Sequence, residues 1–163
     1  MGKEIERKFL VVGDDWRGLG TSVYYCQGYL NSAPERTVRV RIAGEAAFLT
    51  IKGPNTGAAR AEFEYPIPVE DAKALLALAE HPLIEKRRTR IPFEGKVWEV
   101  DEFLGVNAGL IVAEVELKDE SEDVKRPSWA GREVTGLARY YNSSLVAHPY
   151  ADWSAEQKQA RAQ

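Results

Sequence analysis

The sequence predicts a mainly β protein of the α+β class, built from eight antiparallel strands with a few covering helices. Polar and apolar residues alternate with period two through the first two thirds of the chain. Each alternating run ends at Gly, Pro, Asn or Asp, residues that are typical of turns. Because eight strands are enough to close a barrel, an eight-stranded antiparallel β-barrel is the expected architecture.

The expected strands follow directly from the alternating runs. They cover residues 3–12, 23–31, 36–43, 46–53, 60–68, 84–93, 96–103 and 110–118.

Helix-forming sequence interrupts the strands once and follows them at the end. Residues 69–79 are rich in Ala and Leu, carry acids in the first turn and stop before a His-Pro pair, which predicts a helix. A short helical turn is expected at 127–134 and a second helix at 137–146. We expect one domain over residues 1–147, followed by a polar, helix-prone tail at 148–163.

Composition excludes several classes of protein. The 163 residues suit one domain, and 22 basic against 25 acidic side chains give no bulk attraction for nucleic acid or an anionic membrane. The single cysteine, Cys26, excludes an internal disulfide framework and any multi-cysteine zinc site. The charged N-terminus and the lack of a long apolar run argue against a secretory signal or a membrane span. We expect a cytoplasmic protein without nucleic-acid or membrane partners.

Charged residues share one face of seven expected strands, since side chains two apart in a strand point the same way. A sheet with one solvated face would give the same alternation. Two observations favour an inward-facing charged surface instead. Whole strands carry one sign, as in Arg39 with Arg41, and the apolar side of helix 69–79 needs an apolar outer surface to cover. From the residues alone the two arrangements are about equally favoured.

An inward-facing arrangement would narrow the chemistry. Paired carboxylates supply the oxygen ligands that Mg²⁺ or Mn²⁺ prefers, and Arg and Lys supply donors that match phosphate oxygens. A lumen that holds both is suited to a metal-chelated polyphosphate.

The ordered motifs resemble the triphosphate tunnel metalloenzyme superfamily, also called the CYTH proteins. The N-terminal run Glu4-Ile5-Glu6-Arg7-Lys8 matches that family's E-x-E-x-K signature. Further matches follow in the family's order over residues 2–147: Arg39-Val40-Arg41, Thr50-Ile51-Lys52-Gly53, Glu62-Phe63-Glu64, Lys86 with Arg88, Asp101, Glu114-Val115-Glu116, and Val134-Thr135-Gly136 before Arg139-Tyr140-Tyr141-Asn142.

The resemblance implies an eight-stranded antiparallel tunnel with a charged lumen and assigns roles to its residues. By position, the phosphate ligands are Lys8, Arg39, Arg41, Lys52, Lys86 and Arg88. The implied metal ligands are Glu4, Glu6, Glu114 and Glu116, with Glu62, Glu64 and Asp101 as further or water-mediated ligands. A Lys and Tyr pair assigned to catalysis in short family members is matched by Lys8 and Tyr29. Tyr140 and Tyr141 are expected to pack against the barrel.

Among the activities of this family, the short chain most resembles the compact inorganic triphosphatases. The implied reaction is the hydrolysis of tripolyphosphate to pyrophosphate and phosphate with Mg²⁺ or Mn²⁺. A class IV adenylate cyclase, a nucleoside or thiamine triphosphatase and a non-catalytic polyphosphate-binding module remain alternatives. A homodimer is expected from the resemblance alone.

Overall fold

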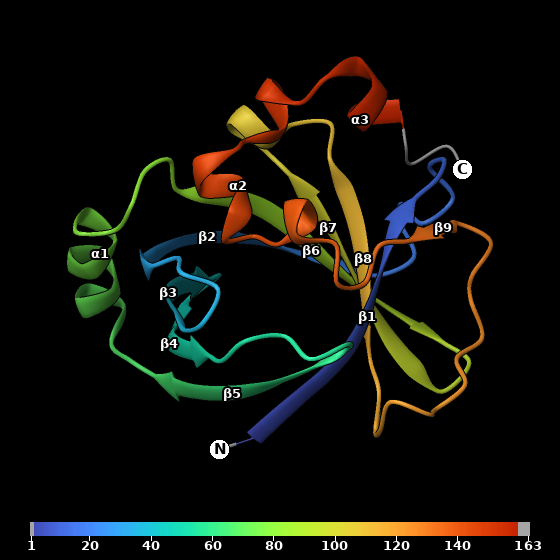
Figure 1. Ribbon diagram of the computed structural model, residues 1–163, viewed down its shortest axis with the longest axis horizontal. Helices are drawn as coiled ribbons and strands as arrows, with labels where there is room; N and C mark the ends of the chain where they lie inside the picture. The colour runs from blue at the N-terminus through green and yellow to red at the C-terminus, as the bar shows by residue number, and fades with distance from the viewer. Residues whose placement is uncertain (1, 160–163) are drawn as a thin grey trace.

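The computed structural model describes residues 2–159 and contains a closed antiparallel barrel (Figure 1). Its strands are β1 (Gly2–Val11), β2 (Thr21–Asn31), β3 (Thr37–Ala43), β4 (Ala46–Lys52), β5 (Ala59–Pro66), β6 (Ile84–Phe93), β7 (Lys96–Phe103), β8 (Ile111–Glu116) and β9 (Ala130–Glu133). Three helices, α1 (Val69–Ala77), α2 (Ser144–Ala147) and α3 (Ala155–Gln159), and three 3-10 turns, η1 (Gly105–Asn107), η2 (Ala138–Tyr140) and η3 (Tyr150–Asp152), complete the described elements. The predicted fold class is confirmed.

The first strand closes the barrel because it pairs with two strands on opposite edges. The hydrogen-bonded order is β5-β4-β3-β2-β6-β7-β8-β1-β9, with a further pairing of β5 to β1. β1 pairs with β5 through its first residues and with β8 from Glu6 to Leu10. Closure leaves β1 to β8 without an unpaired sheet edge along these registers.

The helical turn predicted at 127–134 was wrong, because this segment contains β9. β5 pairs only with residues 2–5 of β1, so the same edge of β1 is open farther along. β9 fills it, pairing Phe9 with Glu133 and Val11 with Ala130. The backbone N–H and C=O groups on this open edge of β1 need hydrogen-bond partners. Pairing with β9 supplies them, although the local sequence favours a helical turn.

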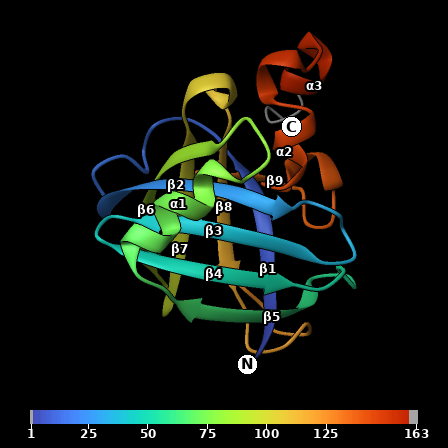
Figure 2. The ribbon, with the colours of Figure 1, turned by 90° about the vertical axis from the view of Figure 1, so that its left-hand side faces the viewer.

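One part of the apolar core lies outside the barrel wall, on the faces opposite the charged lumen. Another part, around Ile84 and Phe103, shares the inward face with Lys86 and packs with the C-terminal segment. α1 forms at the predicted place, and its buried Ala72 and Leu76 pack with Val40 and Ala47. Figure 2 shows α1 lying across the outer face of β2, β3 and β4. Another outer cluster, around the rings of Phe9, Trp98 and Trp129 in tilted and edge-to-face contact, covers β1, β7 and β8.

The helix predicted at 137–146 was also wrong in extent. The segment forms η2, an extended residue at Tyr141 and the short α2. The extended backbone at Tyr141 separates the two helical turns. Tyr140 can therefore pack in the core while Tyr141 lines the lumen.

Part of the expected tail forms α3, and Trp153 is buried in the same cluster as Tyr140. The domain boundary at residue 147 stays a prediction. Within residues 2–159, the helices are all too short or too polar to cross a bilayer.

We predict that Gly28→Ala lowers the free energy of unfolding by about 1–3 kcal/mol, through overpacking of β2 against α1 and the chain that follows it. A Cβ at Gly28 would lie 3.1 Å from Leu76 Cδ2 on α1, and 2.8 Å from Ala79 Cβ and 2.7 Å from Leu83 Cδ2 beyond its end. Urea denaturation measures the effect. Gly53→Ala is the control, since its Cβ would lie 3.6 Å from Ala61 Cβ, in ordinary contact. An unchanged midpoint for Gly28→Ala would contradict the close packing of α1 on the barrel.

Candidate functional site

The lumen of the barrel is a cavity of about 480 Å³. All eight barrel strands contribute lining side chains, because alternate residues of each strand point inward. The lining is dominated by Lys, Arg and Glu, with Thr37, Thr50 and Asn142 among its neutral polar groups. The charged faces therefore point inward, and the alternative of a solvated outer face is excluded.

The structure brings nearly all of the predicted site residues together around this cavity. Those that line it are Glu4, Glu6, Lys8, Tyr29, Arg39, Arg41, Lys52, Glu62, Glu64, Lys86, Arg88, Glu114 and Glu116. Asp101 does not line the cavity but is fully buried behind Lys86 and Arg88.

The alternation of side chains along β6 decides which residues of its basic run, at 86–90, face the lumen. Lys86 and Arg88 are buried on the lumen side, whereas Arg87 is exposed on the outside. Arg90 shares the inner face but its side chain is 63% exposed, beside Glu99 at 3.0 Å. Arg90 therefore lies at the mouth of the tunnel, as its place on the strand predicts.

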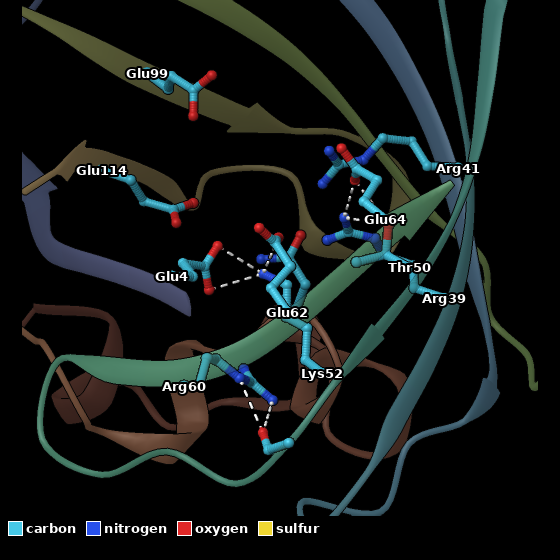
Figure 3. Close-up of polar contacts among 12 residues, drawn as sticks. Glu4, Arg39, Arg41, Thr50, Lys52, Arg60, Glu62, Glu64, Glu99 and Glu114 are labelled. Atoms are coloured by element: carbon cyan, nitrogen blue, oxygen red, sulfur yellow. Dashed lines mark hydrogen bonds and ion pairs between the residues drawn. The ribbon is translucent and has the colours of Figure 1, made fainter. Parts of the chain in front are cut away.

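Acidic and basic side chains pair across one half of the lumen (Figure 3). The Lys52 ammonium donates to both carboxylate oxygens of Glu4, at 2.9 and 2.8 Å, and lies 3.5 Å from Glu62. Arg39 lies 3.6 Å from Glu64. These pairs neutralise charges that burial would otherwise penalise.

The other half of the lumen holds a crowded cationic cluster. Arg88 donates two hydrogen bonds to Asp101, at 2.7 and 2.9 Å, and Lys86 donates a third at 2.7 Å. Burial would raise the pKa of Asp101, but Arg88 and Lys86 together lower it to about 2. Burial lowers the pKa of Lys86 to about 7, although Asp101 opposes the shift.

Arg41 shows that this cluster carries more positive charge than its counter-ions balance. Burial, together with the nearby cations Arg39 and Arg88, lowers the pKa of Arg41 to about 9. Mutual repulsion of this kind is relieved when an anion binds between the cations. The cluster is therefore suited to a polyanionic ligand.

Glu6 and Glu114 form a carboxylate pair on the acidic side. Burial and the neighbouring Glu114 raise the pKa of Glu6 well above its usual range, while Lys8 and a hydrogen bond from Glu6 lower that of Glu114 despite burial. Two buried carboxylates this close disfavour carrying both negative charges. A hard divalent cation would relieve that repulsion, so the donor set fits Mg²⁺ or Mn²⁺.

The carboxylates do not form a compact metal cluster by themselves. Across residues 2–159, no three acidic, His or Cys side chains stand in a ready-made metal-binding arrangement. Glu4 instead forms an ion pair with the Lys52 ammonium at 2.8 Å.

Lys8 and Tyr29 lie at one end of the cavity. The Lys8 ammonium donates to the Tyr140 carbonyl at 3.2 Å and lies 5.7 Å from the centre of the Tyr141 ring. Burial would lower the pKa of Lys8, but Glu114 and Glu6 raise it above its usual value. Tyr29 is 4% exposed and pairs with Arg39 in the β2–β3 register.

Sequence reasoning missed the neutral members of the site. Gln27 and Tyr25 share the inward face of β2 with Tyr29, so parity could have identified them. Tyr141 was expected to pack against the barrel and instead lines the cavity, whereas Tyr140 packs as expected. Asn142 lies within a matched motif, but no local pattern indicates that its side chain enters the tunnel.

A family model for the CYTH domain matches residues 2–150. The chain belongs to the CYTH family.

Named relatives of this CYTH protein cover nearly its whole length. It is 52% identical over 154 residues to an inorganic triphosphatase of Acetivibrio thermocellus, covering 94% of this chain and 99% of the relative. It is 35% identical over 148 residues to an inorganic triphosphatase of Nitrosomonas europaea, covering 88% and 96%. The crystal structure of an inorganic triphosphatase superposes with a TM-score of 0.65 at 33% identity, covering 90% of this chain and 95% of that one.

We predict that Asp101→Asn destabilises this CYTH protein by about 3–5 kcal/mol, because Lys86 and Arg88 would lose their buried counter-charge. The lowered pKa of Asp101 also makes its contribution pH-dependent. It is present above the unfolded pKa of about 4 and is lost as the pH falls towards about 2.

Urea denaturation at neutral pH and between pH 4 and 2 measures both effects. Asp14→Asn is the control, since its ion pair with Arg17 is exposed and is worth less than about 1 kcal/mol. Equal stability of the Asp101 and Asp14 variants would contradict the structural role of Asp101.

Proposed function

We propose that this CYTH protein is a divalent-metal-dependent inorganic triphosphatase, which hydrolyses tripolyphosphate to pyrophosphate and phosphate. The observation that carries the proposal is the lumen itself, where an under-neutralised cationic cluster faces a carboxylate pair within about 480 Å³. The relatives at 52% and 35% identity, both named inorganic triphosphatase, support the same substrate.

The basic side chains would bind the phosphate chain. The residues that would do so reach the lumen from four different strands, so they surround a linear anion on several sides: Lys8, Arg39, Arg41, Lys52, Lys86 and Arg88. Charge-assisted hydrogen bonds from these groups hold the chain in one orientation and stabilise the charge that develops on the leaving phosphate. Arg60 and Arg90 extend the basic lining towards the openings.

The carboxylates Glu4, Glu6, Glu114 and Glu116 would hold Mg²⁺ or Mn²⁺, with Glu62 and Glu64 as further or water-mediated ligands. When bound, such an ion screens phosphate charge and lowers the pKa of an attacking water. Asp101 was expected among these ligands. Its two oxygens are occupied by Lys86 and Arg88, so we assign it to positioning those cations instead.

Lys8 and Tyr29 are proposed to act on the reacting phosphate. Lys8 is held by the Tyr140 carbonyl, which directs the ammonium across the end of the cavity. Lys8 lies beside Glu6 and Glu114 of the carboxylate pair. Tyr29 lies opposite Arg39 on the neighbouring strand, so the two residues approach the lumen from its acidic and basic sides. The expected cytoplasmic location and homodimer stay predictions.

Hydrolysis is favoured over cyclisation of ATP by the lining of the cavity. Among residues 2–159, the aromatic side chains that line it are Tyr29 and Tyr141, both close to the basic cluster. The rest of the lining is charged or small. Such a surface suits a polyphosphate better than an adenine ring, which gains most from aromatic stacking.

Phosphate release by the purified protein tests the proposal. We expect strong preference for tripolyphosphate over ATP and thiamine triphosphate, with Mg²⁺ and Mn²⁺ compared in parallel and cyclic AMP assayed in the ATP reaction. Formation of cyclic AMP with pyrophosphate would identify a cyclase. Inactivity on all three substrates despite tight anion binding would identify a binding module.

Glu116→Gln is expected to lower kcat for tripolyphosphate at least a hundredfold while anion binding, measured by calorimetry without metal, is retained. The loss follows because an amide is a weaker ligand for a hard cation than a carboxylate. Glu45→Gln, at the exposed β3–β4 turn, is the control and keeps full activity. Wild-type turnover in Glu116→Gln would contradict the metal assignment.

Tyr29→Phe removes only a hydroxyl group and tests the catalytic pair. If that hydroxyl acts on the reacting phosphate, kcat should fall about 10–100-fold with KM changed less than about threefold. Steady-state kinetics on tripolyphosphate separate the two constants. An unchanged kcat would remove Tyr29 from the catalytic step and leave it as a wall of the cavity.

A further inference from the structure

Two amides, the buried Gln27 and the half-buried Asn142, join the separate cations of the lumen into one hydrogen-bonded series. Arg41 Nε donates to Gln27 Oε1 at 3.0 Å, and Gln27 Nε2 donates to Asn142 Oδ1 at 3.0 Å. Asn142 Oδ1 also accepts from Lys86 Nζ at 2.9 Å, and Lys86 continues to Asp101. The series crosses from β3 through β2 to the C-terminal segment and back to β6.

The chemistry of the end groups dictates the orientation of both amides. Arg41 and Lys86 are donors only, so each must face an amide oxygen. With Gln27 Oε1 towards Arg41, its NH₂ group faces Asn142, whose oxygen accepts from both sides. Reversing either amide would oppose two donors or two acceptors. A single arrangement therefore satisfies the whole series.

The series also determines which donors remain for a ligand. Lys86 has three N–H groups, of which Asp101 and Asn142 take two among the contacts of residues 2–159. Gln27 Oε1 accepts the hydrogen bond from Nε of Arg41. The two terminal nitrogens of this lumen-lining guanidinium then stay available to a ligand. Because the amides are neutral, they orient these cations without cancelling their charge.

We propose that Gln27 and Asn142 are positioning residues, which together hold Arg41 and Lys86 so that their remaining donors converge on one triphosphate. The proposal rests on the proposed function and deepens it, because it makes phosphate binding depend on the position of the C-terminal segment. Gln27 is fully buried and Asn142 is the one residue of this segment that reaches Lys86 in the contacts of residues 2–159. The C-terminal segment therefore contributes a side chain to the tunnel and also packs against the barrel.

The test is a double-variant cycle on Asn142→Ala and Gln27→Ala. Tripolyphosphate binding is measured by calorimetry without metal, and KM and kcat are measured with Mg²⁺. Each single variant breaks the same bridge, so each should weaken binding and raise KM about tenfold. The double variant should also lose about tenfold, since the bridge is already broken in either single variant. Independent effects would instead multiply to about a hundredfold and would overturn the coupled arrangement.

Asn107→Ala is the matched control, because Asn107 is also buried and its Oδ1 accepts from the Tyr150 N–H outside the tunnel. It should lower stability without changing Kd or KM. All variants are compared at a temperature where circular dichroism shows them folded, and Asn142→Ser replaces Asn142→Ala if the latter does not fold.

The outcomes separate this proposal from the proposed function. A wild-type protein that neither binds nor hydrolyses tripolyphosphate would contradict the proposed function. An active wild type whose Asn142 and Gln27 variants keep Kd and KM within twofold would overturn the positioning role alone. A loss of stability without a change in binding would assign both amides to folding only, and would overturn it as well.

Discussion

The structure depends on one constraint, which is that ionisable side chains buried in a barrel must find their partners inside it. Lys86 and Arg88 share Asp101, and Lys52 binds Glu4. An unpaired charge in such a place would cost several kcal/mol, so most lumen charges are paired with one another, and the cluster around Arg41 is only partly neutralised. Under the proposed function, a metal ion would compete with these partners for the carboxylates, and a polyphosphate would compete for the cations.

The inward charge has a consequence for the outer surface. Since alternate residues of a strand face opposite sides, most charged lumen positions place an apolar neighbour on the outside. α1 covers these apolar neighbours over β2 to β4, and Trp16 and Trp129 cover them over β1 and β7. The C-terminal segment packs instead on inward-facing residues of β1, β2 and β8, through Tyr140 and Trp153. The same strands therefore contribute to stability through their outer faces and to the site through their inner faces.

The C-terminal segment links these two requirements. Tyr140 is buried in the apolar cluster on the inward face, while the next two residues, Tyr141 and Asn142, reach the cavity. The carbonyl of Tyr140 also holds the ammonium of Lys8. The packing of this segment thus sets the position of groups in the cavity, and a change in its fit would alter both the core and the cationic cluster.

The sequence by itself determined the strands, α1 and the charged members of the site, because period-two alternation is local and the parity of a strand decides which side chains face together. It could not decide whether the charged faces point inward, because a solvated sheet has the same pattern. Only the closed barrel settled this, and only its registers showed that Asp101 lies behind Lys86 and Arg88 rather than on the lumen surface. β9 and the position of Asn142 likewise depend on contacts across more than a hundred residues of chain, as in the pairing of Phe9 with Glu133 and the bond of Gln27 to Asn142. Such contacts follow from the closure of the barrel and leave no periodic signal in the sequence.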